Sequence, residues 1–417
     1  MVRVAPCFAL LALPLLLTAQ DDLRDRIEQQ NGTEVRGRVI DPFARDEITV
    51  LQGGRRVRIA RSTIATTDLV GDRIRRFFTK RLALRDSPKA QEFLIDQAVQ
   101  DELPGLARLQ ALWVVLHDDE HEKAHRFLGH EKTRRGWLWP HDGKKLLLPA
   151  LEEALAQRPM LLEGERFTLR CDAGLRTNVA ALLDLERLGT AWLDRFGSEL
   201  GLHEVLRPIA VDVRASSQGF SKWGLRPIPY YVPAPHGDVA RTFYAGPAPI
   251  RPERLFFVGT HGLLYRTLIG DSASRDERAR VCAWLEIGFG MLMEHSMNGP
   301  AGFAEPGEFQ HEDLQALQAL GRGYRLTHLL HLPMYASFYL QDDNETATNW
   351  AAATMFVAWL VDPANPEKTR EPFLQFVREA LGGRKGDSSS RFDKAMGKPV
   401  EALDEPWRKW LAKTAGY

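Results

Sequence analysis

The chain has 417 residues, of which 44% are hydrophobic and 26% charged, so it is neither a disordered nor a collagen-like or coiled-coil protein. Its 55 basic residues are balanced by 55 acidic ones, and no overall field directs it to nucleic acid or to an acidic membrane surface. Three cysteines are too few for a disulfide-built scaffold or a multi-cysteine metal cluster, and the length predicts two or three domains.

The first 20 residues have the pattern of a secretory signal peptide. Arg3 gives a short positive end, residues 8–17 form an apolar run, and acidic residues follow at once. We therefore expect residues 1–20 to be removed and the mature protein to be periplasmic or extracellular, with no transmembrane segment; an uncleaved anchor is the alternative. Cys171 and Cys282 would then remain, either paired or as buried free thiols.

Residues 21–78 are expected to form a small β module. Short runs of β-branched residues alternate with turn signals, and the Gly53-Gly54 pair predicts a hairpin. The module is rich in arginine, which could contact an anionic partner, although a solvated outer face is the interpretation that we prefer. These arginines are Arg36, Arg38, Arg55, Arg56, Arg58 and Arg61.

Residues 79–160 are expected to form a helical segment, because their apolar residues recur at helical spacing. A turn region, GWLWPHDGK, interrupts this pattern before a last helix near residues 148–157. We expect Trp137 and Trp139 in the turn region to be packing anchors between this segment and its neighbours.

The same segment contains the sequence HEKAH, with His121, Glu122 and His125. Two histidines one helical turn apart can hold zinc, with the glutamate as general base. The charged flanks are instead typical of a solvated helix, and nothing singles out a third ligand, for which Glu152 and Glu153 are candidates. We prefer the solvated helix and keep a zinc site here as the alternative.

Residues 161–417 are expected to form an α+β domain. Strand patterns at 166–172, 209–213, 230–232 and 242–244 accompany an amphipathic helix at 178–196. After Leu255 the spacing is helical to the end of the chain. We expect one unit over residues 163–413, in which a small sheet packs on the helix that carries His261.

This order resembles the peptidase MA-like, gluzincin-type domain of secreted bacterial proteins of unknown function. The resemblance covers about residues 163–413 and rests on the segments LFFVGTHGLLYRTLIG and VCAWLEIGFGMLMEH, followed by a closing pattern from Ala395-Met396-Gly397 to Leu403 and Trp407. It implies an H-E-x-x-H helix that binds zinc and a second helix that supplies a glutamate as third ligand.

The zinc motif that the resemblance implies is degenerate in this chain. His261 matches the first ligand, but Gly262 replaces the general base and Tyr265 the second histidine. Ile287 stands at the position of the third ligand, and Glu286 lies one residue earlier, about 100° round the helix. A catalytic zinc needs three protein ligands and a base, so we expect a vestigial cleft with no catalytic residue, zinc or other cofactor.

If the cleft is vestigial, its polar groups need partners within the protein. We expect His261 and Tyr265 to be buried and hydrogen-bonded within the protein or to an ordered water, with His261 and Glu286 as the candidate partners of the Tyr265 hydroxyl. A rebuilt metal site would have to use Glu294 with His295, or the HLLH pair His328 and His331, and neither set is complete.

The preferred hypothesis is a secreted, catalytically inactive pseudo-metallopeptidase that binds or scaffolds an unknown protein or envelope partner, with no role for nucleic acid. An active zinc metallopeptidase that uses HEKAH or a rebuilt site is one alternative. A structural cell-envelope protein is the other.

Overall fold

The computed structural model describes most of the chain after residue 23. The described residues are 24–84, 86–218, 229–232, 239–244, 251–268, 282–298, 323–332, 338, 343–365, 367–381 and 388–414. The expected signal peptide, residues 1–20, lies outside them.

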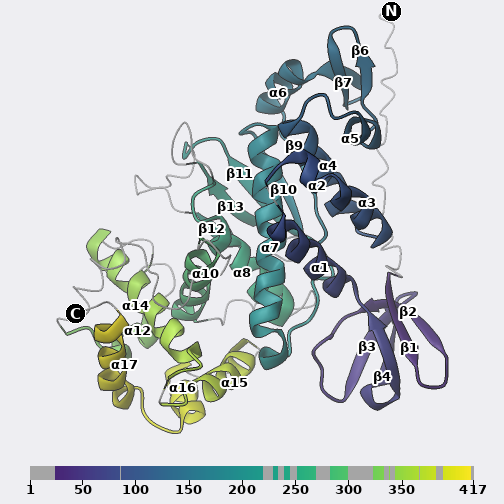
Figure 1. Ribbon diagram of the computed structural model, residues 1–417. Helices are drawn as coiled ribbons and strands as arrows, with labels where there is room; N and C mark the ends of the chain where they lie inside the picture. The colour runs from purple at the N-terminus through teal and green to yellow at the C-terminus, as the bar shows by residue number, and fades with distance from the viewer. Residues whose placement is uncertain are drawn as a thin grey trace, which may run out of the picture.

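The protein has an α+β fold in which three sheets surround the long helix α7 (Leu175–Leu200) (Figure 1). The N-terminal sheet and a small three-stranded sheet lie toward opposite ends of α7, and the C-terminal helices form a separate group beside the first of these ends (Figure 1). The expected fold class is therefore confirmed.

The N-terminal sheet is antiparallel with the strand order β4-β3-β2-β1-β5, in which β1 to β4 form a meander and β5 returns to pair with β1. Gly53 and Gly54 form the predicted hairpin, and both have positive φ angles (53° and 75°), which glycine adopts without strain. The sheet encloses a small apolar core of its own, made by Ile27, Val39, Ile48, Val50 and Ile59. Its strands are β1 (Asp25–Gln29), β2 (Glu34–Val39), β3 (Glu47–Gln52), β4 (Arg55–Ala60) and β5 (Ile64–Asp68).

The strands end earlier than the expected boundary at residue 78. Helix α1 (Val70–Ala83) begins directly after β5. Ile74, Phe77 and Phe78 are buried on one face of this helix, so helical spacing already governs residues 70–78.

The middle of the chain is helical, as expected, but contains a sheet that the sequence analysis missed. Residues 136–141, which belong to the expected turn region, form strand β7 of the order β6-β7-β8. Trp137 and Trp139 lie two residues apart and are both buried, and their rings contact His125 and His130 of the same segment. The elements are α2 (Pro88–Gln91), α3 (Phe93–Gln100), α4 (Pro104–His117), α5 (Glu122–Phe127), β6 (Glu131–Thr133), β7 (Gly136–His141), β8 (Lys144–Leu147) and α6 (Leu148–Gln157).

A mixed five-stranded sheet forms the centre of the C-terminal half, with the order β12-β13-β11-β10-β9. Strands β10 and β11 are parallel, with Phe167 opposite Ile209, so the two strands predicted for one unit are direct neighbours. Both edge strands, β9 and β12, are antiparallel to their neighbours. The strands are β9 (Met160–Glu163), β10 (Phe167–Cys171), β11 (Ile209–Arg214), β12 (Tyr230–Val232) and β13 (Val239–Phe243).

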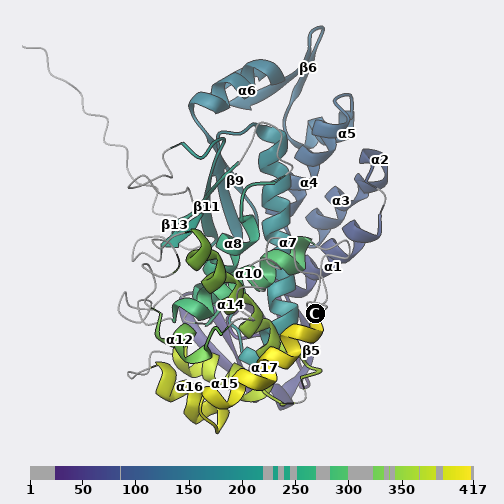
Figure 2. The same ribbon diagram turned by 90° about the vertical axis from the view of Figure 1, so that its left-hand side faces the viewer.

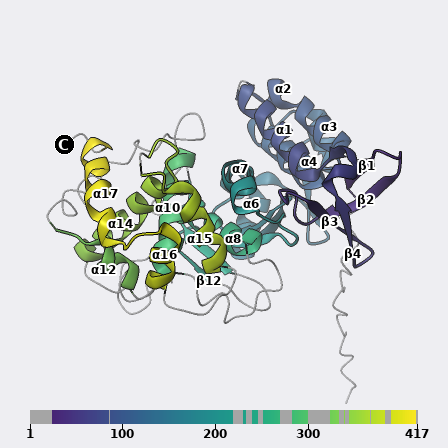
Figure 3. The same ribbon diagram turned by 90° about the horizontal axis from the view of Figure 1, so that it is seen from below.

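Helix α8 (Leu255–Leu268) packs on this sheet against β11, β12 and β13, and α10 (Ala283–Asn298) packs on α8. Figure 2 shows α8 beside the sheet, with α10 and α14 following toward the C-terminal helices. Figure 3 shows the same C-terminal group from below. The remaining helices are α12 (Leu326–His331), α14 (Asp343–Val361), α15 (Arg370–Leu381), α16 (Ser388–Met396) and α17 (Glu401–Thr414).

One continuous apolar core runs from Ile74 to Leu411, so the helical segment shares its core with the C-terminal α+β domain. Cys171 and Cys282 are both buried, free thiols. Among the described residues, no helix combines the length and the apolar character that a membrane crossing requires.

Candidate functional site

The degenerate zinc motif lies where α8 is enclosed between the sheet and α10. His261 and Tyr265 are one turn apart on α8, and Glu286 is in the first turn of α10. All three side chains are buried, with exposed fractions of 3%, 3% and 4%.

Glu286 is the hydrogen-bond partner of both α8 side chains. His261 Nε2 donates to the backbone carbonyl of Glu286 over 2.9 Å. The hydroxyl of Tyr265 donates to the Glu286 carboxyl group. The expectation that His261 and Tyr265 are buried and hydrogen-bonded within the protein is therefore confirmed, and Glu286, one of the two candidates, is a partner of the Tyr265 hydroxyl.

Burial disfavours the charged forms of His261 and Glu286. It lowers the pKa of His261 to about 4, and the hydrogen bond to the Glu286 carbonyl offsets only part of that effect. Burial also raises the pKa of Glu286 well above its usual range. Burial thus favours the neutral forms of the His261 imidazole and the Glu286 carboxyl group, which are joined to Tyr265 in one buried polar network.

Aromatic rings occupy the space next to His261 and Tyr265. Tyr231 of β12 stacks on Tyr265, with ring centroids 5.3 Å apart. Phe257 of α8 contacts His261 with a centroid distance of 4.2 Å. The cleft position is therefore packed with side chains from α8 and the edge strand.

Two glycines bring the neighbouring backbones close to this cluster. A Cβ atom on Gly262 would lie 2.6 Å from Cγ2 of Ile209, which is part of β11. A Cβ atom on Gly290 would lie 2.8 Å from His261 Nε2. Position 262 therefore has no room for the glutamate that an H-E-x-x-H motif carries.

These residues do not fit a zinc ion. The Nε2 atom of His261 donates a hydrogen bond to a backbone carbonyl, and the hydroxyl of Tyr265 donates one to Glu286. Ile287 has no atom that can bind a metal. Zinc in proteins takes nitrogen, thiolate or carboxylate ligands, usually three from the protein in a catalytic site. Within the described ranges no group of three or more His, Cys, Asp or Glu side chains is arranged to hold a metal.

The HEKAH residues do not converge on one point. His121 lies at the N-terminus of α5, where its Nδ1 accepts from the Ala124 amide and its Nε2 lies 3.0 Å from Glu92 Oε2. Glu122 is exposed and pairs with Arg126. The expected solvated helix is correct for Glu122, but His125 is buried.

His125 belongs to an aromatic cluster that the sequence analysis did not identify. Its Nε2 donates to the Asp119 carbonyl over 2.9 Å, so its Nδ1 is the acceptor for His130 Nδ1 at 2.7 Å. The His125 ring stacks on Trp137 at 4.2 Å, and the His130 ring contacts Trp139 at 3.9 Å. His130, five residues after His125, is the feature of the sequence that could have indicated this cluster.

Burial lowers the pKa of both imidazoles in this cluster. The pKa of His130 falls to about 4, because of burial first and then the proximity of His125 and Arg108. That of His125 is also lowered, chiefly by burial. One hydrogen bond joins the two Nδ1 atoms, and the lowered pKa values disfavour a positive charge on either ring.

The other candidate ligands do not form a metal site among the described residues. Glu294 is buried on α10, where its carboxylate accepts from the Phe257 amide over 2.9 Å, and His295 is buried beside it in the sequence. His328 and His331 are exposed on α12. Glu152 and Glu153 are exposed on α6 and join none of these groups.

Comparisons with known proteins add no relative: no protein-family model matches the chain, and no curated protein matches it.

Proposed function

We propose that this protein is a secreted, catalytically inactive gluzincin-like protein that binds or scaffolds a protein or envelope partner. The observation that carries the proposal is the hydrogen bond from Tyr265 to Glu286. Tyr265 stands where the resemblance places the second zinc ligand, and its hydrogen bond joins α8 to α10 instead. A group that serves the core in this way is not available to a metal.

The arrangement of the surrounding elements supports the same conclusion. The resemblance implies a strand, a helix and a second strand, followed by the motif helix and then by the helix that supplies the third ligand. Here the sheet covers α8 and α10 packs on it, in the expected order along the chain. The framework of such a domain can persist when its chemistry is lost, because fold and site are separable.

The replacement at Gly262 removes the general base as well as the room for one. Activation of a metal-bound water requires a group that accepts its proton. Glycine has none, and Ile209 of β11 fills the space that a longer side chain would need. Binding or scaffolding requires only the folded surface.

Stoichiometric metal analysis tests this proposal. The purified protein is loaded with zinc, dialysed and analysed for metal, and we expect far less than one tightly held ion per chain. About one retained ion per chain would contradict the inactive assignment. Loss of that ion in His125→Ala would then favour HEKAH as its site.

A restored motif serves as the matched variant. Gly262→Glu, Tyr265→His and Ile287→Glu together should either create zinc affinity or unfold the protein, since three polar groups would enter a packed site. If the triple variant leaves both stability and metal content unchanged, α8 and α10 are not the counterpart of a zinc cleft.

A further inference from the structure

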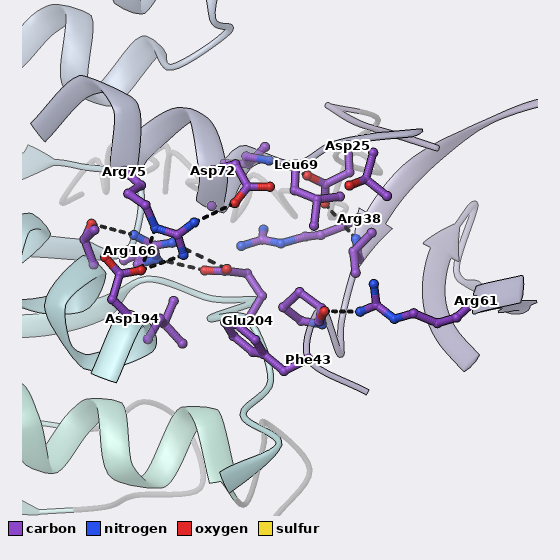
Figure 4. A pocket seen from close by; sticks show the side chains of 17 residues that line it. Asp25, Arg38, Phe43, Arg61, Leu69, Asp72, Arg75, Arg166, Asp194 and Glu204 are labelled. Carbon is purple, nitrogen blue, oxygen red and sulfur yellow. Dashed lines mark hydrogen bonds and ion pairs between the residues drawn. The ribbon is translucent and has the colours of Figure 1, made fainter. Parts of the chain in front are cut away.

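A cavity of about 200 Å³ lies where the N-terminal sheet meets α1 and α7 (Figure 4). At about 30 Å³ per water molecule this volume holds roughly seven waters. Figure 4 shows charged side chains approaching the cavity from both sides, the sheet on one and the two helices on the other. None of these residues belongs to the α8–α10 cluster.

The charges that line the cavity cancel. Four arginines face four carboxylate residues, so the formal charge of the lining is 4 − 4 = 0. The lining therefore attracts neither an anion nor a cation through its net charge. The arginines are Arg38, Arg61, Arg75 and Arg166. The carboxylates are Asp25, Asp72, Asp194 and Glu204.

Several of these charges already neutralise one another. At the back wall, Arg166 Nε lies 2.8 Å from Glu204 Oε1, and the arginine is 2% exposed. On the side of the helices, Arg75 binds Oδ1 of Asp72 over 2.9 Å and Oδ1 of Asp194 over 2.6 Å. A charged ligand would have to compete with these pairs in a partly desolvated place.

An uncharged hydroxyl compound can bind without breaking the pairs. A carboxylate has about four acceptor positions and a guanidinium five N–H donors, so each paired group keeps some of its capacity. The bonds of Arg75 engage Oδ1 of Asp72 and Asp194, which leaves Oδ2 of each to accept from a hydroxyl group. Adjacent hydroxyls can then both donate and accept along this wall.

One aromatic ring supplies an apolar face. Phe43 lines the cavity and is seated against α7, where a Cβ atom on Gly197 would lie 2.4 Å from the ring. Arg61 binds the carbonyls of Pro42 and Ala44, the two residues beside this phenylalanine. The Phe43 ring therefore rests on α7, and Arg61 fixes the backbone on either side of this residue.

Gly71 keeps the cavity open on the side of α1. A Cβ atom at this position would come within 3.2 Å of Glu204 Oε2 and 3.4 Å of Arg166 Nη2. The missing side chain therefore leaves access to the paired groups at the back wall.

We propose that this cavity binds an uncharged polyhydroxy compound of about the size of one sugar ring. The proposal does not depend on whether the α8–α10 pair derives from a zinc site, so metal analysis and sugar binding can fail separately.

Calorimetric titration of the purified protein tests the ligand class. The neutral probes are D-glucose, N-acetyl-D-glucosamine and myo-inositol, and the charged probes are D-glucuronate and D-glucosamine. We expect at least one neutral probe to bind with a Kd on the order of 1 mM or lower, a typical efficiency for a ligand of this size. Both charged probes should bind at least about tenfold more weakly. No binding of any neutral probe, or tighter binding of a charged one, would overturn the proposal.

Two variants locate the site. Asp194→Ala removes an acceptor from a side chain that is 38% exposed, and Gly71→Ala narrows the cavity while placing a better helix former in α1. Each should weaken binding about tenfold or more, the effect of one lost polar contact or of a steric clash. The control is Asp96→Ala, which removes an exposed, ion-paired aspartate from α3 outside the cavity. Thermal unfolding confirms that the variants are folded, and unchanged binding in both cavity variants would place the sugar elsewhere and overturn the assignment.

Discussion

The hydroxyl group of Tyr265 on α8 donates a hydrogen bond to the carboxyl group of Glu286 on α10, and both residues are almost fully buried. The contact joins two helices that are neighbours in space and also ties the edge strand to them, because Tyr231 stacks on the same tyrosine. A polar contact inside an apolar environment contributes to stability only while both partners are present.

Tyr265→Phe should lower the free energy of unfolding by about 1 kcal/mol, the usual net value of one hydrogen bond. The ring packing against Tyr231 would be retained, so the effect isolates the hydroxyl. Urea unfolding measures the difference. A double-mutant cycle with Glu286→Gln provides the control, and purely additive effects would show that the two side chains do not interact.

Glu286→Gln should change the pH dependence of stability in a defined direction. Because burial raises the pKa of Glu286, the folded state holds this proton more tightly than the unfolded state does. The resulting stability is fully present below the ordinary value of 4.5 and is lost as the pH rises toward the folded-state pKa. Glutamine has no proton to lose, so the variant should gain stability relative to the parent as the pH rises from about 5 upward. Parallel pH profiles of the two proteins would contradict the raised pKa.

Gly262→Ala should destabilise the protein by about 1–3 kcal/mol, the range for overpacking a filled core. The reason is the 2.6 Å approach of the new Cβ atom to Ile209 on β11. Gly71→Ala is the matched control and should lower the free energy of unfolding less. Its new Cβ atom would lie 3.2 Å from Glu204 Oε2 and 3.4 Å from Arg166 Nη2, which are the ends of side chains.

The clash at position 262 also predicts a compensating change. Ile209→Ala should be destabilising alone, but the double variant should cost less than the sum of the two single changes. Denaturant unfolding of the four proteins checks this, and additivity would place Gly262 away from β11.

His130→Gln should remove part of the acid sensitivity of the protein. The pKa of His130 is lowered to about 4 in the folded state, whereas its ordinary value is 6.5. The unfolded state therefore binds the proton more readily, and stability falls as the pH drops through 6.5 toward 4. In the glutamine variant this slope should be smaller, as unfolding at a series of pH values would show. An unchanged slope in His130→Gln would contradict the lowered pKa of His130.

The features that the sequence predicts are those with a local signal. The alternation around Phe167 and Ile209 and the apolar stripe between 178 and 196 correspond to β10, β11 and α7. The burial of Tyr265 follows from its place on the apolar face of a helix, and Glu286 lies on the next described helix.

The features that the sequence did not predict depend on how side chains pack and not on a local pattern. The two buried tryptophans make residues 136–141 a strand, although glycine and proline at these positions favour a turn. The hydrogen bond between His125 and His130 depends on how the chain turns after α5. The cavity combines residues that lie as far apart in the sequence as Asp25 and Glu204. The strand and the histidine pair depend on packing within residues 121–147, whereas the cavity depends on contacts between distant segments.

The separate apolar core of the N-terminal sheet has a consequence for how the molecule loses its structure. The links that bind this sheet to the remainder include the Asp25 carboxylate on the Val70 amide, Arg38 on the Val205 carbonyl and Arg24 on Glu165. Such contacts transmit less cooperativity than a continuous apolar core does, and exposed ion pairs weaken further with added salt. The sheet should therefore behave as its own foldon, whose amide hydrogens exchange with solvent through openings that leave the core between Ile74 and Leu411 protected.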